Sequence, residues 1–209
     1  YIELSSNISD HIANNLTLEA WAYSNQLTVA SDFRGLITER YAGDSDVEFE
    51  IFLKGANHNL TAAFYTGGIW YELQSPTFTA GVWAHVAATY DGHYIRIYKD
   101  GVEIATSSDL NIALPSGING WRIGHRHDNS GPGNVWNGTI DEVRFYNITL
   151  SANEILEHYK TNYNVIHSDE TENHEYWHCE VTPNNNTADG TSVNSSTLFI
   201  NNTLPTQGT

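Results

Sequence analysis

The chain has 209 residues, of which 40% are hydrophobic and 12% aromatic, so it can fill a sizeable core. Nine Lys and Arg stand against 25 Asp and Glu, a formal net charge of −16, which excludes nucleic acid and anionic membranes as expected partners. No apolar run reaches the length of a membrane span, and no signal peptide is recognisable. Because the chain contains no Met, we interpret it as processed or as a segment of a longer protein.

Short strands separated by turns are predicted from residue 1 to about residue 147. Apolar residues alternate at residues 16–23 and again at 46–54, where the odd-numbered positions from Val47 to Leu53 would face a core. Turn residues then predict hairpins and the last strands. The predicted turns are Gly67-Gly68, Asp91-Gly92-His93 and Asp100-Gly101, and the strands around and after them are 60–66, 69–74, 83–90, 94–99, 121–124 and 139–146.

The pattern changes at residues 150–159, which predict one short helix. Ser151 is the expected N-cap, and Glu154 three residues later completes a capping box. Ile155, Leu156 and Tyr159 would form its buried stripe. Many short strands with one helix predict an all-β antiparallel sandwich over residues 1–160.

The remaining residues read as a linker at 161–174, a two-stranded β segment at 175–200 and a tail at 201–209. Two strands cannot bury a core alone, so this segment must pack on the sandwich, pair with residues absent here, or pair with another chain. Cys179 has no partner within the chain, and we interpret it as a small buried hydrophobe.

Glycosylation triplets point to an extracellular or cell-surface glycoprotein. An alternative is that an Asn- and Thr-rich chain forms some triplets by chance. The acceptor residues are Asn7, Asn15, Asn59, Asn137, Asn147, Asn185, Asn194 and Asn201.

Five ordered blocks carry a resemblance to a known family. They read LEAWAY at 18–23, WAHVAATYDG at 83–92, IYKDG at 97–101, WNGTIDEVRFYN at 136–147 and LSANEI at 150–155. Together they resemble the laminin-G-like, concanavalin-A-like lectin/glucanase superfamily, which implies a jelly-roll sandwich. Residues 177–184, 188–190 and 195–196 resemble instead the last two strands of an immunoglobulin-like repeat of archaeal and bacterial surface proteins.

The first candidate site is Asp141. The resemblance implies that an acidic residue in this strand helps to hold one structural Ca²⁺, together with backbone carbonyls of the N-terminal region. The alternative is that Asp141 hydrogen-bonds a neighbouring loop, and the sequence leaves both interpretations open.

The second candidate is the acidic series Asp46, Glu48 and Glu50, whose side chains alternate along one strand. Retaining glucanases of the superfamily use a similar spacing of carboxylates. No cleft motif accompanies the series, so an exposed acidic face is the favoured interpretation.

The third candidate is a set of aromatic and polar residues in or beside predicted loops. Aromatic faces stack on sugar rings, and carboxylates accept sugar hydroxyls, so the set predicts a ligand-binding site. Its members are Tyr41, Asp44, Trp70, Tyr71, His125, His127 and Asp128. Trp121 and Trp136 are predicted to belong to the core, and His85 to be structural.

These observations predict a non-catalytic extracellular module that binds or connects, as part of a cell-surface adhesin or filament. The alternative is a carbohydrate-binding module or glycoside hydrolase of the same superfamily. The expected partner is a glycan, a surface protein, or further copies of this chain through strand addition by residues 175–200.

Overall fold

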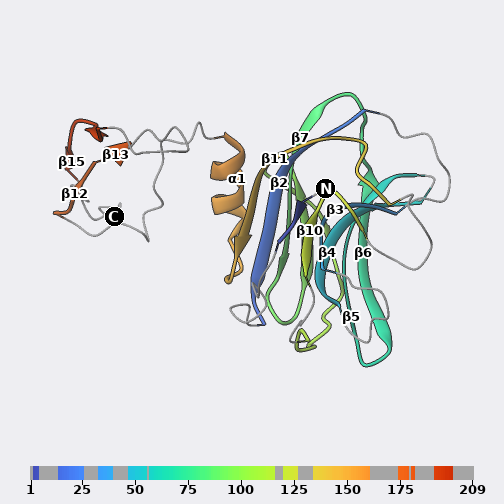
Figure 1. Cartoon of the computed structure of the whole chain (residues 1–209). Coiled ribbons are helices and arrows are strands. Elements are labelled where there is room, and N and C mark those ends of the chain that lie inside the picture. The colour runs from blue at the N-terminus through green and yellow to red at the C-terminus, as the bar shows by residue number, and fades with distance from the viewer. Residues whose placement is uncertain are drawn as a thin grey trace, which may run out of the picture. The chain divides into compact units, whose positions relative to one another are not determined.

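The computed structural model divides the chain into two compact units, Tyr1–Lys160 and Thr161–Thr209 (Figure 1). The structure describes residues 2–4, 14–25, 33–39, 47–55, 57–115, 120–126, 134–160, 174–178, 180–181 and 191–199. None of these residues belongs to a helix that is long and apolar enough to cross a membrane.

The first unit is a sandwich of two antiparallel sheets, which confirms the predicted fold class (Figure 1). The six-stranded sheet has the order β1 (Ile2–Glu3), β10 (Trp121–Ile123), β3 (Phe33–Glu39), β4 (Val47–Lys54), β5 (Asn59–Thr66) and β6 (Ile69–Thr77). The five-stranded sheet has the order β11 (Gly138–Tyr146), β2 (Leu16–Ser24), β7 (Trp83–Tyr90), β8 (Ile95–Lys99) and β9 (Val102–Thr106).

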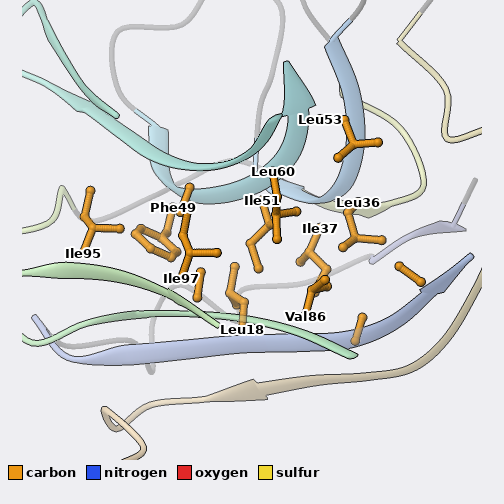
Figure 2. Packing of buried hydrophobic residues seen from close by; sticks show 14 of the residues in the cluster. Leu18, Leu36, Ile37, Phe49, Ile51, Leu53, Leu60, Val86, Ile95 and Ile97 are labelled. Carbon is orange, nitrogen blue, oxygen red and sulfur yellow. The ribbon is translucent and has the colours of Figure 1, made fainter. Parts of the chain in front are cut away.

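The core lies between the inner faces of the two sheets. Figure 2 shows Phe49 and Ile51 of β4 pointing toward Leu18 of β2 and Ile97 of β8, and all four are at most 1% exposed. The alternation along β4 places Phe49, Ile51 and Leu53 in this core, as the sequence predicts. Burial of each such side chain contributes on the order of 1.5–3 kcal/mol.

Glycine-containing turns set the hairpin registers. Gly67 and Gly68 have φ angles of 58° and 82°, and this tight turn joins β5 to β6. Asp91 organises the next turn, because its carboxylate accepts hydrogen bonds from the backbone amides of His93 at 2.9 Å and Tyr94 at 2.7 Å. Both hairpins are confirmed, and their turns lie where the sequence places them.

Helix α1 (Ala152–Lys160) packs on the outer face of the five-stranded sheet, that is, the face directed away from the core. The capping box is confirmed, since Ser151 N donates to Glu154 Oε2 at 2.6 Å and Glu154 N donates to Ser151 Oγ at 3.3 Å. Ile155 is fully buried against Ala87 and Tyr98, whereas Tyr159 is 37% exposed.

The second unit contains two short antiparallel pairs, β12 (Tyr176–Trp177) with β15 (Leu198–Phe199), and β13 (Glu180–Val181) with β14 (Val193–Asn194). Both pairs join the two predicted strands of this segment, with a register shift of one residue between them. The immunoglobulin-like resemblance stays a prediction. Cys179, most of the expected linker and the tail lie outside the described residues.

Candidate functional site

The aromatic and polar set predicted from the sequence is only partly within the described residues. Trp70 is half-buried on β6, while Tyr71 beside it turns toward the core and stacks on Phe64 with ring centroids 4.9 Å apart. His125 is half-buried, two residues after the end of β10. Tyr41, Asp44, His127 and Asp128 lie outside the described residues.

Trp70 belongs to an aromatic pair on the outer face of the six-stranded sheet. It lies directly opposite Tyr65 in the β5–β6 hairpin, and the two ring centroids are 5.0 Å apart. The Gly67-Gly68 turn fixes this register, so the turn itself brings the two rings together. Both side chains are half-buried, which leaves part of each ring accessible to a ligand.

Arg126 lies beside Trp70 in a cluster that the sequence analysis missed. Its guanidinium carbon is 4.3 Å from the ring centroid of Phe52, 4.6 Å from that of Phe33 and 5.6 Å from that of Trp70. These distances are typical of cation–π contacts. We call Arg126, Glu50, Phe33, Phe52 and Trp70 the arginine cluster.

Glu50 neutralises Arg126 within this cluster. Arg126 Nε donates to Oε1 and Oε2 at 3.0 and 3.1 Å, and Nη2 donates to Oε1 at 2.8 Å. The two side chains are 4% and 0% exposed, respectively. A paired guanidinium and carboxylate tolerate this burial because each satisfies the charge and hydrogen bonds of the other.

The prediction of an exposed acidic face on β4 is therefore wrong for Glu50. Its side chain is 0% exposed and its carboxylate is bound to Arg126, so it cannot reach a substrate in solution. Asp46 and the side chain of Glu48 lie outside the described residues.

Gly35 of β3 seats the segment that carries Arg126. A Cβ atom at Gly35 would lie 2.3 Å from Arg126 N and 2.5 Å from the carbonyl carbon of His125. Two hydrogen bonds hold the segment there, from Thr38 Oγ1 to His125 O at 2.8 Å and from Arg126 N to Asn134 O at 3.0 Å. Only glycine permits so close an approach of two backbones.

Polar side chains lie farther along the same sheet face, away from the Gly67-Gly68 turn. Asn59 Nδ2 donates to Gln74 Oε1 at 3.2 Å, and Lys54 forms an ion pair with Glu72. We call Tyr65, Trp70, Asn59, Gln74, Lys54 and Glu72 the Trp70 face. Aromatic rings flanked by amide and carboxylate groups are suited to ligands that have both apolar surface and hydroxyl groups.

A second charged cluster holds α1 on the other sheet. Glu19 is 0% exposed and accepts hydrogen bonds from Arg144 Nη1 at 2.9 Å and Tyr146 OH at 3.1 Å. His158 Nδ1 of α1 lies 3.0 Å from Glu19 Oε2, and His85 Nε2 lies 3.7 Å from the same oxygen.

These contacts shift the titration of the three groups. Burial alone would raise the pKa of Glu19, but hydrogen bonds from His158 and Arg144 hold it below its ordinary value. The hydrogen bond with Glu19 raises the pKa of His158. Burial lowers the pKa of His85, a 1% exposed residue that fits the predicted structural role.

Asp141 lies on β11, where its exposed side chain accepts a hydrogen bond from Glu142 N at 2.9 Å. Within the described ranges, His, Cys, Asp and Glu side chains form no group of three suited to a metal ion. Asp141 thus has a local partner, and the structural Ca²⁺ stays a prediction drawn from the resemblance.

The glycosylation sites also stay predictions, but their surroundings differ. Asn15, Asn137, Asn147 and Asn194 are exposed, whereas Asn59 is half-buried and donates its side-chain amide to Gln74. Asn7, Asn185 and Asn201 lie outside the described residues.

The two antiparallel sheets form the β-sandwich that is typical of concanavalin A-like proteins. Residues 1–156 match the concanavalin A-like lectin/glucanases superfamily, in its laminin G form, and the chain belongs to this family. A search of curated proteins finds no match to this sequence.

Solved structures share the fold at low sequence identity. Domain 4 of the extracellular arabinanase AbnA of Geobacillus stearothermophilus, in complex with arabinotriose, is 19% identical, with a TM-score of 0.54 over 70% of this chain and 66% of that chain. The CBM40 of Ruminococcus gnavus IT-sialidase, bound to α2,3 sialyllactose, is 17% identical, with a TM-score of 0.57 over 74% and 94%. A heptameric pentraxin of Limulus polyphemus is 15% identical, with a TM-score of 0.51 over 69% of each chain.

Proposed function

We propose that the sandwich is a non-catalytic glycan-binding module whose ligand stacks on the Trp70 face. The observation that carries this proposal is the half-buried Trp70–Tyr65 pair, which presents two adjoining rings on an outer sheet face. Sugar rings have apolar C–H faces that pack on aromatic rings, and their hydroxyls hydrogen-bond to nearby amides and carboxylates.

The arginine cluster gives the proposed platform rigidity. Trp70 contacts the guanidinium of Arg126, which three hydrogen bonds fix to Glu50 of β4, two strands away from β6 in the same sheet. A ring whose orientation is already set loses little conformational freedom on binding. The arabinanase domain and the CBM40, which share the fold, were both solved with oligosaccharides, and this supports the proposal.

The carboxylates of this face favour a non-catalytic role over glycoside hydrolysis, because they are paired with cationic side chains. Hydrolysis by this chemistry requires two carboxyl groups that both reach the glycosidic bond. Of the carboxylates described on the outer face of β4 and β6, Glu50 is bound to Arg126 and Glu72 is paired with Lys54. The glycosylation triplets support a place outside the cell or on its surface.

Binding is tested with a glycan array followed by calorimetry on the variants Trp70→Ala and Trp83→Ala. Trp83 is the matched control, because it is 45% exposed on the other sheet and also contacts a tyrosine ring, that of Tyr23 at 5.7 Å. We expect Trp70→Ala to weaken binding about tenfold or more, since ~1.4 kcal/mol of stacking corresponds to a factor of ten. Equal losses in the two variants would contradict the proposal.

A second candidate function, self-assembly as part of an adhesin or filament, is favoured by the second unit. Tyr176, Val193 and Phe199 are 71%, 67% and 41% exposed on strands that pair only two by two among the described residues. Such strands gain burial when another chain adds to their edge. Light scattering across a concentration series tests it: we expect oligomers that Val193→Lys dissociates, and a monomer at every concentration would exclude it.

A further inference from the structure

We infer that the ligand of the Trp70 face is an uncharged glycan, and that acidic sugars are excluded. This inference rests on the proposed function and names the class of glycan. It follows from where the few cationic side chains of the molecule lie and what they bind.

The chain has nine Lys and Arg, and the structure accounts for eight of them. Two lie in the Trp70 face or beside it, where Lys54 pairs with Glu72 and Arg126 with Glu50. Four others are paired elsewhere in the sandwich: Arg96 with Asp91, Lys99 with Asp100, Arg144 with Glu19 and Lys160 with Glu157. Arg34 and Arg122 are only 5% and 8% exposed, and Arg40 lies outside the described residues.

Recognition of a sugar carboxylate or sulfate calls for a cation whose donors can reach the ligand. Arg126 contacts Trp70, with its guanidinium carbon 5.6 Å from the ring centroid, yet its side chain is 4% exposed and already bound to a carboxylate. Lys54 is bound to the carboxylate of Glu72. An acidic sugar placed on Trp70 would therefore have to displace a carboxylate that is already paired with a cation, and it would lose hydration.

The net charge of the protein adds to the discrimination against acidic sugars. With a net charge of −16, the protein repels an anionic ligand at distances within the Debye length, which is about 8 Å at physiological ionic strength. A neutral sugar meets no such barrier. Tyr65 and Trp70 offer it apolar surface, and Asn59, Gln74 and Glu72 offer it hydrogen-bonding groups.

The two solved complexes illustrate the distinction. Arabinotriose, bound to the arabinanase domain, is neutral, whereas sialyllactose, bound to the CBM40, carries a carboxylate. We expect this chain to bind neutral pentose or hexose oligomers and to reject sialyllactose, although it shares the fold of both proteins.

The test is calorimetry on the full chain with two sets of oligosaccharides, at low and at high NaCl. The neutral set contains arabino-, xylo- and cello-oligosaccharides, and the acidic set contains sialyllactose and oligogalacturonate. We expect Trp70-dependent binding within the neutral set only, with a Kd that salt changes less than twofold. Trp70-dependent binding of an acidic sugar, weakened by salt, would overturn the inference and leave the proposed function intact. No Trp70-dependent binding in either set would overturn both.

A charge variant gives a second, independent readout. Glu72→Gln removes the partner of Lys54, so a cation becomes available on the Trp70 face, and we expect binding of oligogalacturonate to rise at least fivefold at low salt. Glu157→Gln is the matched control, because it releases Lys160 on α1, away from the Trp70 face. An equal rise in both variants would show a nonspecific charge effect and would contradict the inference.

Discussion

Arg126 and Glu50 are 76 residues apart in the chain, yet they share three hydrogen bonds in a site almost closed to solvent. The pair ties the segment after β10 to the central strand β4. It also supports the guanidinium against which Trp70 lies. The fold and the candidate site therefore depend on the same interaction.

Removal of one partner should destabilise the protein strongly. We expect Glu50→Gln to lower the free energy of unfolding by about 3–5 kcal/mol, because the buried guanidinium loses its counter-charge. Chemical denaturation measures this loss. Glu72→Gln is the control, since it breaks an accessible ion pair worth at most about 1 kcal/mol. In the double variant Glu50→Gln/Arg126→Met, a loss equal to the sum of the single losses would argue against direct coupling.

Substitution of Gly35 should disturb the contact between β3 and the segment that carries Arg126. In Gly35→Ala the added methyl group would lie 2.3 Å from Arg126 N, so the segment must move or the strand must shift. We expect a loss of about 1–3 kcal/mol, comparable to overpacking in a core, together with weaker glycan binding. Thermal denaturation and calorimetry report the two effects, and a variant with unchanged melting temperature would refute the close packing.

The contact between α1 and β2 should make stability depend on pH. The pKa of His158 is raised above 6.5, so its contribution is complete below that pH and is lost as pH rises through the folded-state value. The pKa of Glu19 is lowered from 4.5, so its contribution is complete above that pH and is lost as pH falls through its own folded-state value. Both contributions are present together between these two ordinary values.

We therefore compare wild type with His158→Gln in denaturant titrations across this range. The stability advantage of the wild type should be largest between about pH 4.5 and 6.5 and should shrink above neutrality. Burial lowers the pKa of His85 in both proteins, and the variant removes only the smaller lowering effect that the charge of His158 has on this pKa. An advantage that does not vary with pH would show that His158 acts through packing alone.

The helix cap offers a smaller and separate test. Ser151→Ala removes the hydroxyl that accepts a hydrogen bond from Glu154 N, and we expect a loss of about 1 kcal/mol. Ser108→Ala, in an exposed segment between strands, serves as the control. A loss in the control as large as in Ser151→Ala would contradict the capping role.

Local signals predicted much of the sandwich. The turn at Gly67-Gly68 and the alternation along β4 are visible in the sequence, because tight turns require particular residues and a strand exposes alternate faces. Strand β3 was not predicted. Its residues Arg34 and Glu39 are 5% and 0% exposed, so polar side chains lie buried in a strand where alternation would otherwise be expected.

The candidate site was predicted only in part, for a similar reason. Trp70 could be named, since an aromatic residue beside a hairpin turn is a recognisable feature. The pairing of Glu50 with Arg126 depends on a contact between segments that are distant in the sequence, and no local sequence pattern indicates it. Glu50 consequently looked like one more acid on a solvated face.

Strand β2 lies between β7 and β11 in the sheet. Its pairing with β11 places Thr17 opposite Tyr146, a residue near the C-terminal end of the first unit's sequence. While the chain is being synthesised, one edge of β2 stays unpaired until β11 has been made. Glu19 likewise lacks Arg144 and His158 until those residues have been made. Pairings so distant in sequence make folding slow, in the range of milliseconds to seconds for comparable topologies. A chain interrupted before residue 138 would leave that strand edge open to association with other chains.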